Sequence, residues 1–276
     1  MNLHSIATIA RQELIISIRN RWTLIFAAVF AVLVLALSYF GLVTAGAVGF
    51  QGFVRTAASL LNLVLYLVPL VALTMGTLSF TSEKSSSEIL FSQPVSRGDI
   101  LMGKLAGLFA SLAAATLLGF GAAGLVIAAG ARSSGAVRYP GFVGLSLALG
   151  LVFLVLSAVV ATACHRRNVA FGVSLFVWFF FVLLYDLLVM GATFMLRERT
   201  ANTFLFVSLL GNPVDIVRVG CLMILDGKEV FGATGAALLR FLGGDAAAFC
   251  VLAVALLAWI AVPLIVARKA LDAQDI

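Results

Sequence analysis

Six long apolar stretches constrain this sequence more than any other feature. A helix needs about 20 mainly apolar residues to cross the hydrocarbon core of a bilayer. Each stretch reaches that length, and none alternates apolar and polar residues as the strands of a membrane barrel do. The stretches cover residues 22–43, 57–80, 105–131, 142–163, 169–196 and 246–267. The sequence therefore predicts an all-α membrane protein, in which residues 1–276 form a single domain with six transmembrane helices.

The composition excludes several classes of protein. Of the 276 residues, 63% are hydrophobic and 11% are charged, whereas a soluble domain is roughly 45–50% apolar and about 25% charged. We therefore expect neither a cytosolic enzyme nor a secreted disulfide scaffold. The three cysteines have no metal-binding spacing, and no catalytic dyad or triad stands out. We expect no enzymatic activity and no cofactor in this chain.

The basic residues indicate the orientation of the chain. Segments on the cytoplasmic side of a membrane carry an excess of Lys and Arg. With the N-terminus in the cytoplasm, the cytoplasmic segments hold most of these residues, and the short opposite loops hold only Arg55, Arg132 and Arg138. We predict that both termini are cytoplasmic. The net charge of +6 then reflects this asymmetry and not binding of nucleic acid.

Residues 2–20 are predicted to form an amphipathic helix in the membrane interface. Apolar residues recur there at helical spacing, and the chain is expected to turn at Asn20 before it enters the bilayer. The helix is either a lipid anchor or a contact for a soluble partner. Its apolar positions are Leu3, Ile6, Ala7, Ala10, Leu14 and Ile18.

Residues 81–104 are the most informative polar segment. We predict a helix over residues 82–92 that Pro94 ends, and a second helix that Ser96 caps and that begins near Gly98. The segment is either a docking elbow for a soluble partner or a solvated connector. Residues 98–104 also fit G-x-x-x-x-G-K, but Leu105 follows in place of Ser or Thr and no strand precedes it, so we predict no ATP binding.

The segment 197–245 is predicted to hold short external helices in the outer leaflet, which cap a cavity or receive a partner. Asn212 is a helix cap, Pro213 suits the first helical position, and Asp215 suits the first turn. Asp215 and Arg218 are three residues apart and are expected to pair on one face.

Asp186 is the outstanding residue inside the apolar stretches, because an ionised carboxylate in lipid must be paired or hydrated. It is either a cation relay or gate latch, or a buried acid held by a hydroxyl such as that of Thr74 or Thr116. Asn62 and Tyr66 are further candidate partners.

Three other patterns concern metal ligands and contacts between helices. Soft ligands for cuprous ion lie toward the outer side, although scattered soft residues are more often packing filler. Gly103 and Gly107 form a G-x-x-x-G pattern typical of close helix contacts. The aromatic face of residues 169–196 faces either a second copy or lipid. The soft residues are Met190, Met195, Cys221 and Met223.

Two motifs resemble those of ABC-2 type permeases. They are E-L-I-I-S-I-R-N-R-W (residues 13–22) and Q-P-V-S-R-G-D-I-L-M-G-K (residues 93–104). Within that family, V-L-L-Y-D-L-L around Asp186 and N-P-V-D-I-V-R (residues 212–218) resemble the permeases of nitrous oxide reductase maturation systems. The resemblance covers essentially the whole chain.

The resemblance implies a multi-pass protein of the bacterial inner membrane with a type V exporter-like fold. It also implies a homodimer and a cytoplasmic ATPase dimer that holds ATP and Mg. For the subgroup, it implies a periplasmic β-helical partner that receives copper or a sulfur species. The residues expected to contact the ATPase are Glu13, Arg19, Glu83, Lys84, Glu88, Pro94, Arg97 and Arg166.

Other functions stay open at this point. An ABC-2 exporter of a lipid or drug-like substrate would keep the elbow but lack the external partner. A secondary transporter would use Asp186 as a proton or sodium carrier, although we see no clear inverted repeats or paired broken helices. A third alternative is a membrane anchor for an extracytoplasmic copper chaperone.

Overall fold

Within the residues that the structure describes, every regular element is a helix, which confirms the predicted class. This computed structural model describes residues 3–48, 50–82, 96–130, 139–164, 166–224 and 245–273. The elements are α1 (Leu3–Arg19), α2 (Arg21–Val48), α3 (Phe50–Ser82), α5 (Arg97–Gly130), α6 (Tyr139–Ala163), α7 (Arg167–Phe179), the π-helix η2 (Phe180–Leu184), α8 (Tyr185–Met195), α9 (Glu198–Leu210), α10 (Pro213–Ile224) and α12 (Asp245–Asp272).

The six predicted apolar stretches lie in these helices, except for Leu196, which follows α8, and residue 131, which lies outside the described residues. Among the described residues, five continuous segments are long and apolar enough to cross a membrane. Two further pairs of helices meet that criterion only together and are bent, α1 with residues 23–37 of α2 by 66° and residues 203–210 of α9 with α10 by 103°. The chain therefore turns at Asn20 as predicted, and a second sharp corner lies between α9 and α10.

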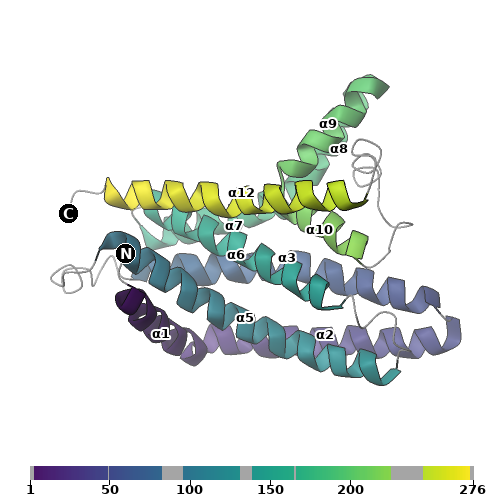
Figure 1. Cartoon of the computed structure of the whole chain (residues 1–276), viewed down its shortest axis with the longest axis horizontal. Coiled ribbons are helices and arrows are strands. Elements are labelled where there is room, and N and C mark those ends of the chain that lie inside the picture. The colour runs from purple at the N-terminus through teal and green to yellow at the C-terminus, as the bar shows by residue number, and fades with distance from the viewer. Residues whose placement is uncertain are drawn as a thin grey trace.

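The helices form an elongated bundle in which both termini lie at the same end (Figure 1). We call this the terminal end and the opposite one the distal end. The hairpin of α8 and α9 projects sideways from the distal half of the bundle (Figure 1). The predicted topology, in which both termini are cytoplasmic, stays a prediction.

Aromatic packing joins α2, α5 and α6. Phe120 meets Phe30 with ring centroids 5.5 Å apart and Phe142 at 5.3 Å, both edge to face. The Tyr139 hydroxyl donates a 2.8 Å hydrogen bond to the Phe120 carbonyl, so its polar group is satisfied within the apolar core.

The second helix predicted for the elbow begins where the sequence predicted it. Ser96 Oγ accepts a 3.1 Å hydrogen bond from the Asp99 amide, so Ser96 caps α5. The G-x-x-x-x-G-K residues 98–104 lie inside this helix and form no loop. The predicted helix over residues 82–92 falls mostly outside the described residues.

Both α1 and α10 pack against the bundle. Leu3, Ala7 and Ile18 of the predicted apolar face of α1 are exposed, and Glu13 is buried where α5 packs against the helix. Within the predicted external segment, most residues of α10 are buried, and the helix packs against α6 and α12. The interfacial position of α1 and the external position of residues 197–245 stay predictions.

Candidate functional site

The corner between α9 and α10 brings together the predicted external residues. Asn212 Oδ1 accepts a 3.0 Å hydrogen bond from the Val214 amide, and Pro213 is the first residue of α10. This confirms the predicted cap. Asn212 is 0% exposed, so its side chain holds the corner in place and does not face a partner directly.

Backbone carbonyls at this corner accept hydrogen bonds from side chains of other helices. The Tyr185 hydroxyl donates to the Ser208 carbonyl at 2.7 Å, and Trp259 Nε1 of α12 donates to the Leu210 carbonyl at 3.0 Å. Asn212 Nδ2 donates to the Phe181 carbonyl of η2 at 3.0 Å. Since lipid offers no hydrogen-bond donors, these side chains allow a sharp corner within the membrane-spanning bundle.

Arg218 lies between two carboxylates. Its Nη1 donates to Asp186 Oδ2 at 2.8 Å and to Asp215 Oδ1 at 2.7 Å. The predicted pairing of Asp215 with Arg218 is therefore correct. The partner predicted for Asp186 is wrong, because Thr74 and Thr116 both donate to carbonyls of their own helices.

The two carboxylates differ in their contact with the surroundings. The side chain of Asp215 is 12% exposed and accepts a second hydrogen bond from Asn212 Nδ2 at 3.0 Å. The side chain of Asp186 is 41% exposed. Arg218 thus ties an accessible residue of α8 to a buried residue of α10. These two ion pairs hold α8 and α10 together, and the pair with Asp186 is the one that water can reach.

The other predicted partners of Asp186 lie on α3. Asn62 is exposed, and Tyr66 contributes its backbone carbonyl, which accepts a 2.9 Å hydrogen bond from Trp178 Nε1 of α7. This bond lies three residues before Pro69, which has no N–H for the helix ladder.

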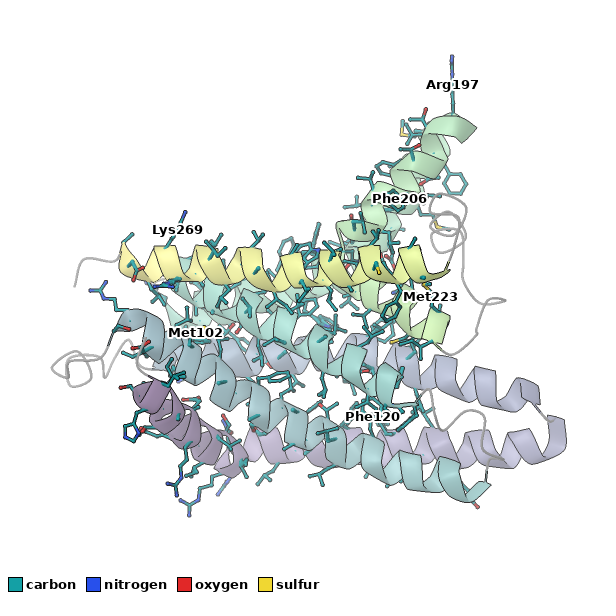
Figure 2. The ribbon with its side chains drawn as sticks, in the orientation of Figure 1. Met102, Phe120, Arg197, Phe206, Met223 and Lys269 are labelled. Atoms are coloured by element: carbon teal, nitrogen blue, oxygen red, sulfur yellow. The ribbon has the colours of Figure 1, made fainter. Side chains whose placement is uncertain are left out.

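The predicted soft ligands occupy unlike surroundings. Met190 and Met195 of α8 are 62% and 90% exposed, whereas Cys221 of α10 is 0% exposed. Met223 packs partly buried against the core (Figure 2). In the part of the chain that the structure describes, no group of three His, Cys, Asp or Glu side chains is arranged to hold a metal ion.

The residues predicted to contact the ATPase differ in exposure, and some lie outside the described residues. Arg19 and Arg166 are exposed, whereas Glu13 is buried. Arg97 Nη1 donates a 2.8 Å hydrogen bond to the Leu271 carbonyl and so ties the start of α5 to the end of α12. Glu83, Lys84, Glu88 and Pro94 lie outside the described residues.

Several residues that hold the corner were not predicted. Tyr185 and Trp259 carry hydrogen-bond donors within apolar helices, and such donors usually find a partner when buried. That rule marks them as candidates but does not identify the acceptors, which lie 23 and 49 residues away in the sequence.

Comparison with known proteins supplies the family. The sequence matches the family model described as ABC-2 family transporter protein over residues 7–276. It is similar to a probable ABC transporter permease protein NosY of Pseudomonas aeruginosa, at 38% identity over 234 residues, 83% of this chain and 84% of the relative. It is also similar to a protein of the same name from Stutzerimonas stutzeri, at 37% identity over 272 residues, 96% of this chain and 97% of the relative.

Proposed function

Because the chain belongs to the ABC-2 family and is a permease subunit of an ABC transporter, we propose that a separate cytoplasmic ATPase drives its movement. Hydrolysis of ATP by that partner would shift the terminal end, and the α9–α10 corner would respond in the distal half. The observation that carries this proposal is the Arg218 tie, which joins α8 to α10 and has one accessible carboxylate.

The position of the α8–α9 hairpin supports a contact between the moving distal half and a partner outside the membrane. Arg197 lies at the tip of the hairpin, away from the rest of the bundle (Figure 2). We propose that the hairpin meets a periplasmic β-helical protein, and that the subunit acts in delivery of copper or a sulfur species for nitrous oxide reductase maturation. The two relatives named NosY support this choice over a general exporter.

The exposed apolar face of the fifth span supports a homodimer. Phe176 of α7 is 61% exposed and Leu187 of α8 is 65% exposed, although both lie in a segment that crosses the membrane. We propose that a second copy covers part of this face and that lipid covers the rest.

The proposal is tested by co-purification of this chain with the cytoplasmic ATPase that it is proposed to bind. We expect the double variant Arg19→Glu/Arg166→Glu to lower recovery of the ATPase by about tenfold, because reversed charges on a docking face repel the partner. Arg197→Glu is the matched control, since it reverses an exposed arginine at the distal hairpin. Unchanged recovery in the double variant, or an equal loss in the control, would contradict ATPase docking at the terminal end.

A further inference from the structure

The N-terminal helix α1 packs closely against α5 at two glycines. A Cβ added at Gly103 would lie 2.8 Å from Ile9 Cβ, and one added at Gly107 would lie 2.5 Å from the Ala10 carbonyl oxygen and 2.7 Å from Glu13 Cβ. Such distances leave no room for a side chain. The G-x-x-x-G pattern therefore serves the contact with α1, and the backbones of the two helices touch.

Two buried side chains of opposite charge lie at this contact. Glu13 of α1 and Lys104 of α5 are 6% and 3% exposed. Ser79 Oγ of α3 donates to Glu13 Oε1 at 2.6 Å. Lys104 Nζ donates to the Ser79 carbonyl at 3.2 Å and to Ser79 Oγ at 3.3 Å.

These three residues lie on three different helices at the terminal end. Ser79 lies in the last turn of α3, and Lys104 lies in the second turn of α5. Ser79 therefore precedes the predicted docking elbow (residues 81–104), and Lys104 is the last residue of that elbow. A helix that served only as a lipid anchor would need neither a buried charge nor a glycine contact with the bundle.

We infer that Glu13, Ser79 and Lys104 are positioning residues that make α1 a rigid part of the coupling apparatus. The inference rests on the proposed function and deepens it. A shift of the neighbouring ends of α3 and α5 then moves α1 as well, because the buried charges join the three helices. Loss of one charge leaves the other buried and uncompensated, which costs free energy. Loss of both charges removes that cost.

The test uses the complete complex of permease and ATPase in lipid vesicles. An environment-sensitive dye on Arg197→Cys reports movement of the distal hairpin, in a chain where Cys164 and Cys250 are replaced by serine. The change in dye emission is recorded after addition of ATP with vanadate, and the rate of ATP hydrolysis is measured in a parallel sample without vanadate. The wild-type complex is expected to show both hydrolysis and an emission change.

In Glu13→Gln and in Lys104→Met, we expect hydrolysis to continue while the emission change falls by about tenfold. The double variant is expected to recover part of that change, which a simple loss of contacts would not produce. Ser79→Ala provides a milder test should the charge variants fold poorly, and Ser79→Thr, which keeps the hydroxyl, is expected to restore coupling. Arg11→Gln removes a charge from the exposed face of the same helix and serves as the control.

The outcomes separate the two proposals. A full emission change in Glu13→Gln and in Ser79→Ala would overturn the positioning role, while the ATPase-driven function would stand. Loss of the ATPase from Glu13→Gln would also overturn it, because Glu13 would then act in docking. If the wild-type chain bound no ATPase, the proposed function itself would be refuted.

Discussion

Replacement of Arg218 by methionine tests whether its two ion pairs hold α10 in place. Arg218 Nη1 lies 2.7 Å from Asp215 Oδ1 and 2.8 Å from Asp186 Oδ2. Methionine keeps an unbranched apolar stem but removes the charge and both hydrogen bonds. The variant therefore leaves two carboxylates near one another with no cation between them.

The expected size of the effect on local opening of α10 follows from the unequal exposure of the two carboxylates. The Asp215 side chain is 12% exposed, so loss of its cation approaches the lower limit for a broken buried pair, about 3 kcal/mol. The Asp186 side chain is 41% exposed and can be hydrated, so its pair contributes about 1 kcal/mol or less. We expect local opening of α10 to rise about 150-fold or more in Arg218→Met and about fivefold or less in Asp186→Asn.

Alkylation of Cys221 measures this opening. Cys221 lies three residues after Arg218 on α10 and is 0% exposed, so a thiol reagent reaches it only when the helix moves out of the core. The labelling rate then follows the population of the open form. Cys164 and Cys250 are replaced by serine so that Cys221 is the only thiol.

Arg197→Met is the matched control for this experiment, because Arg197 is an exposed arginine on the distal hairpin. Its labelling rate should equal that of the parent chain. Similar labelling rates in Arg218→Met and in the control would refute the assignment of the ion pairs as the tie. A faster rate in Asp186→Asn than in Arg218→Met would refute the reasoning from exposure.

Three further predictions concern close packing and helix register. Gly107→Ala places a methyl group against the α1 backbone and should lower stability by about 2 kcal/mol, seen as a lower melting temperature in detergent. Gly211→Ala meets the Tyr185 hydroxyl oxygen, so Tyr185→Phe in the same chain should offset part of its destabilisation, by about 1 kcal/mol; fully additive melting shifts would contradict this contact. Deletion of Leu183 removes the one residue by which a π turn exceeds an α turn, so it should convert the π-helix to an α-helix and leave Asp186 beside Arg218; the same alkylation assay should then report an unchanged labelling rate.

The features that sequence predicted correctly depend on residues close together in the chain. Apolar length identified the spans, and Ser96 and Asn212 marked helix starts because a cap acts within three residues of its own position. The pairing of Asp215 with Arg218 was predictable for the same reason, since residues three apart share a helix face.

The features that sequence did not predict depend on distant residues or on altered helix geometry. Asp186 and Arg218 are 32 residues apart, and no periodicity links them. The π-helix over residues 180–184 shifts the face of everything that follows, so a face assigned with the ordinary period is wrong beyond it. Glu13 was expected to contact the ATPase, but the close approach of α1 to α5 at Gly107 buries it.

A chain of contacts between the two ends of the molecule passes through irregular backbone in two adjacent spans. α3 holds Ser79 at the terminal end and is weakened at Pro69, where the ladder lacks an N–H. α7 packs on α3, and Trp178 joins them by its bond to the Tyr66 carbonyl. The π-helix begins two residues later and contacts the corner through the Phe181 carbonyl. A π turn differs from an α turn by one residue of register, so a change between the two turn types would shift the register of the helix without breaking it. A shift of α3 can therefore reach the corner without unfolding either span, provided that α7 follows it through the bond from Trp178.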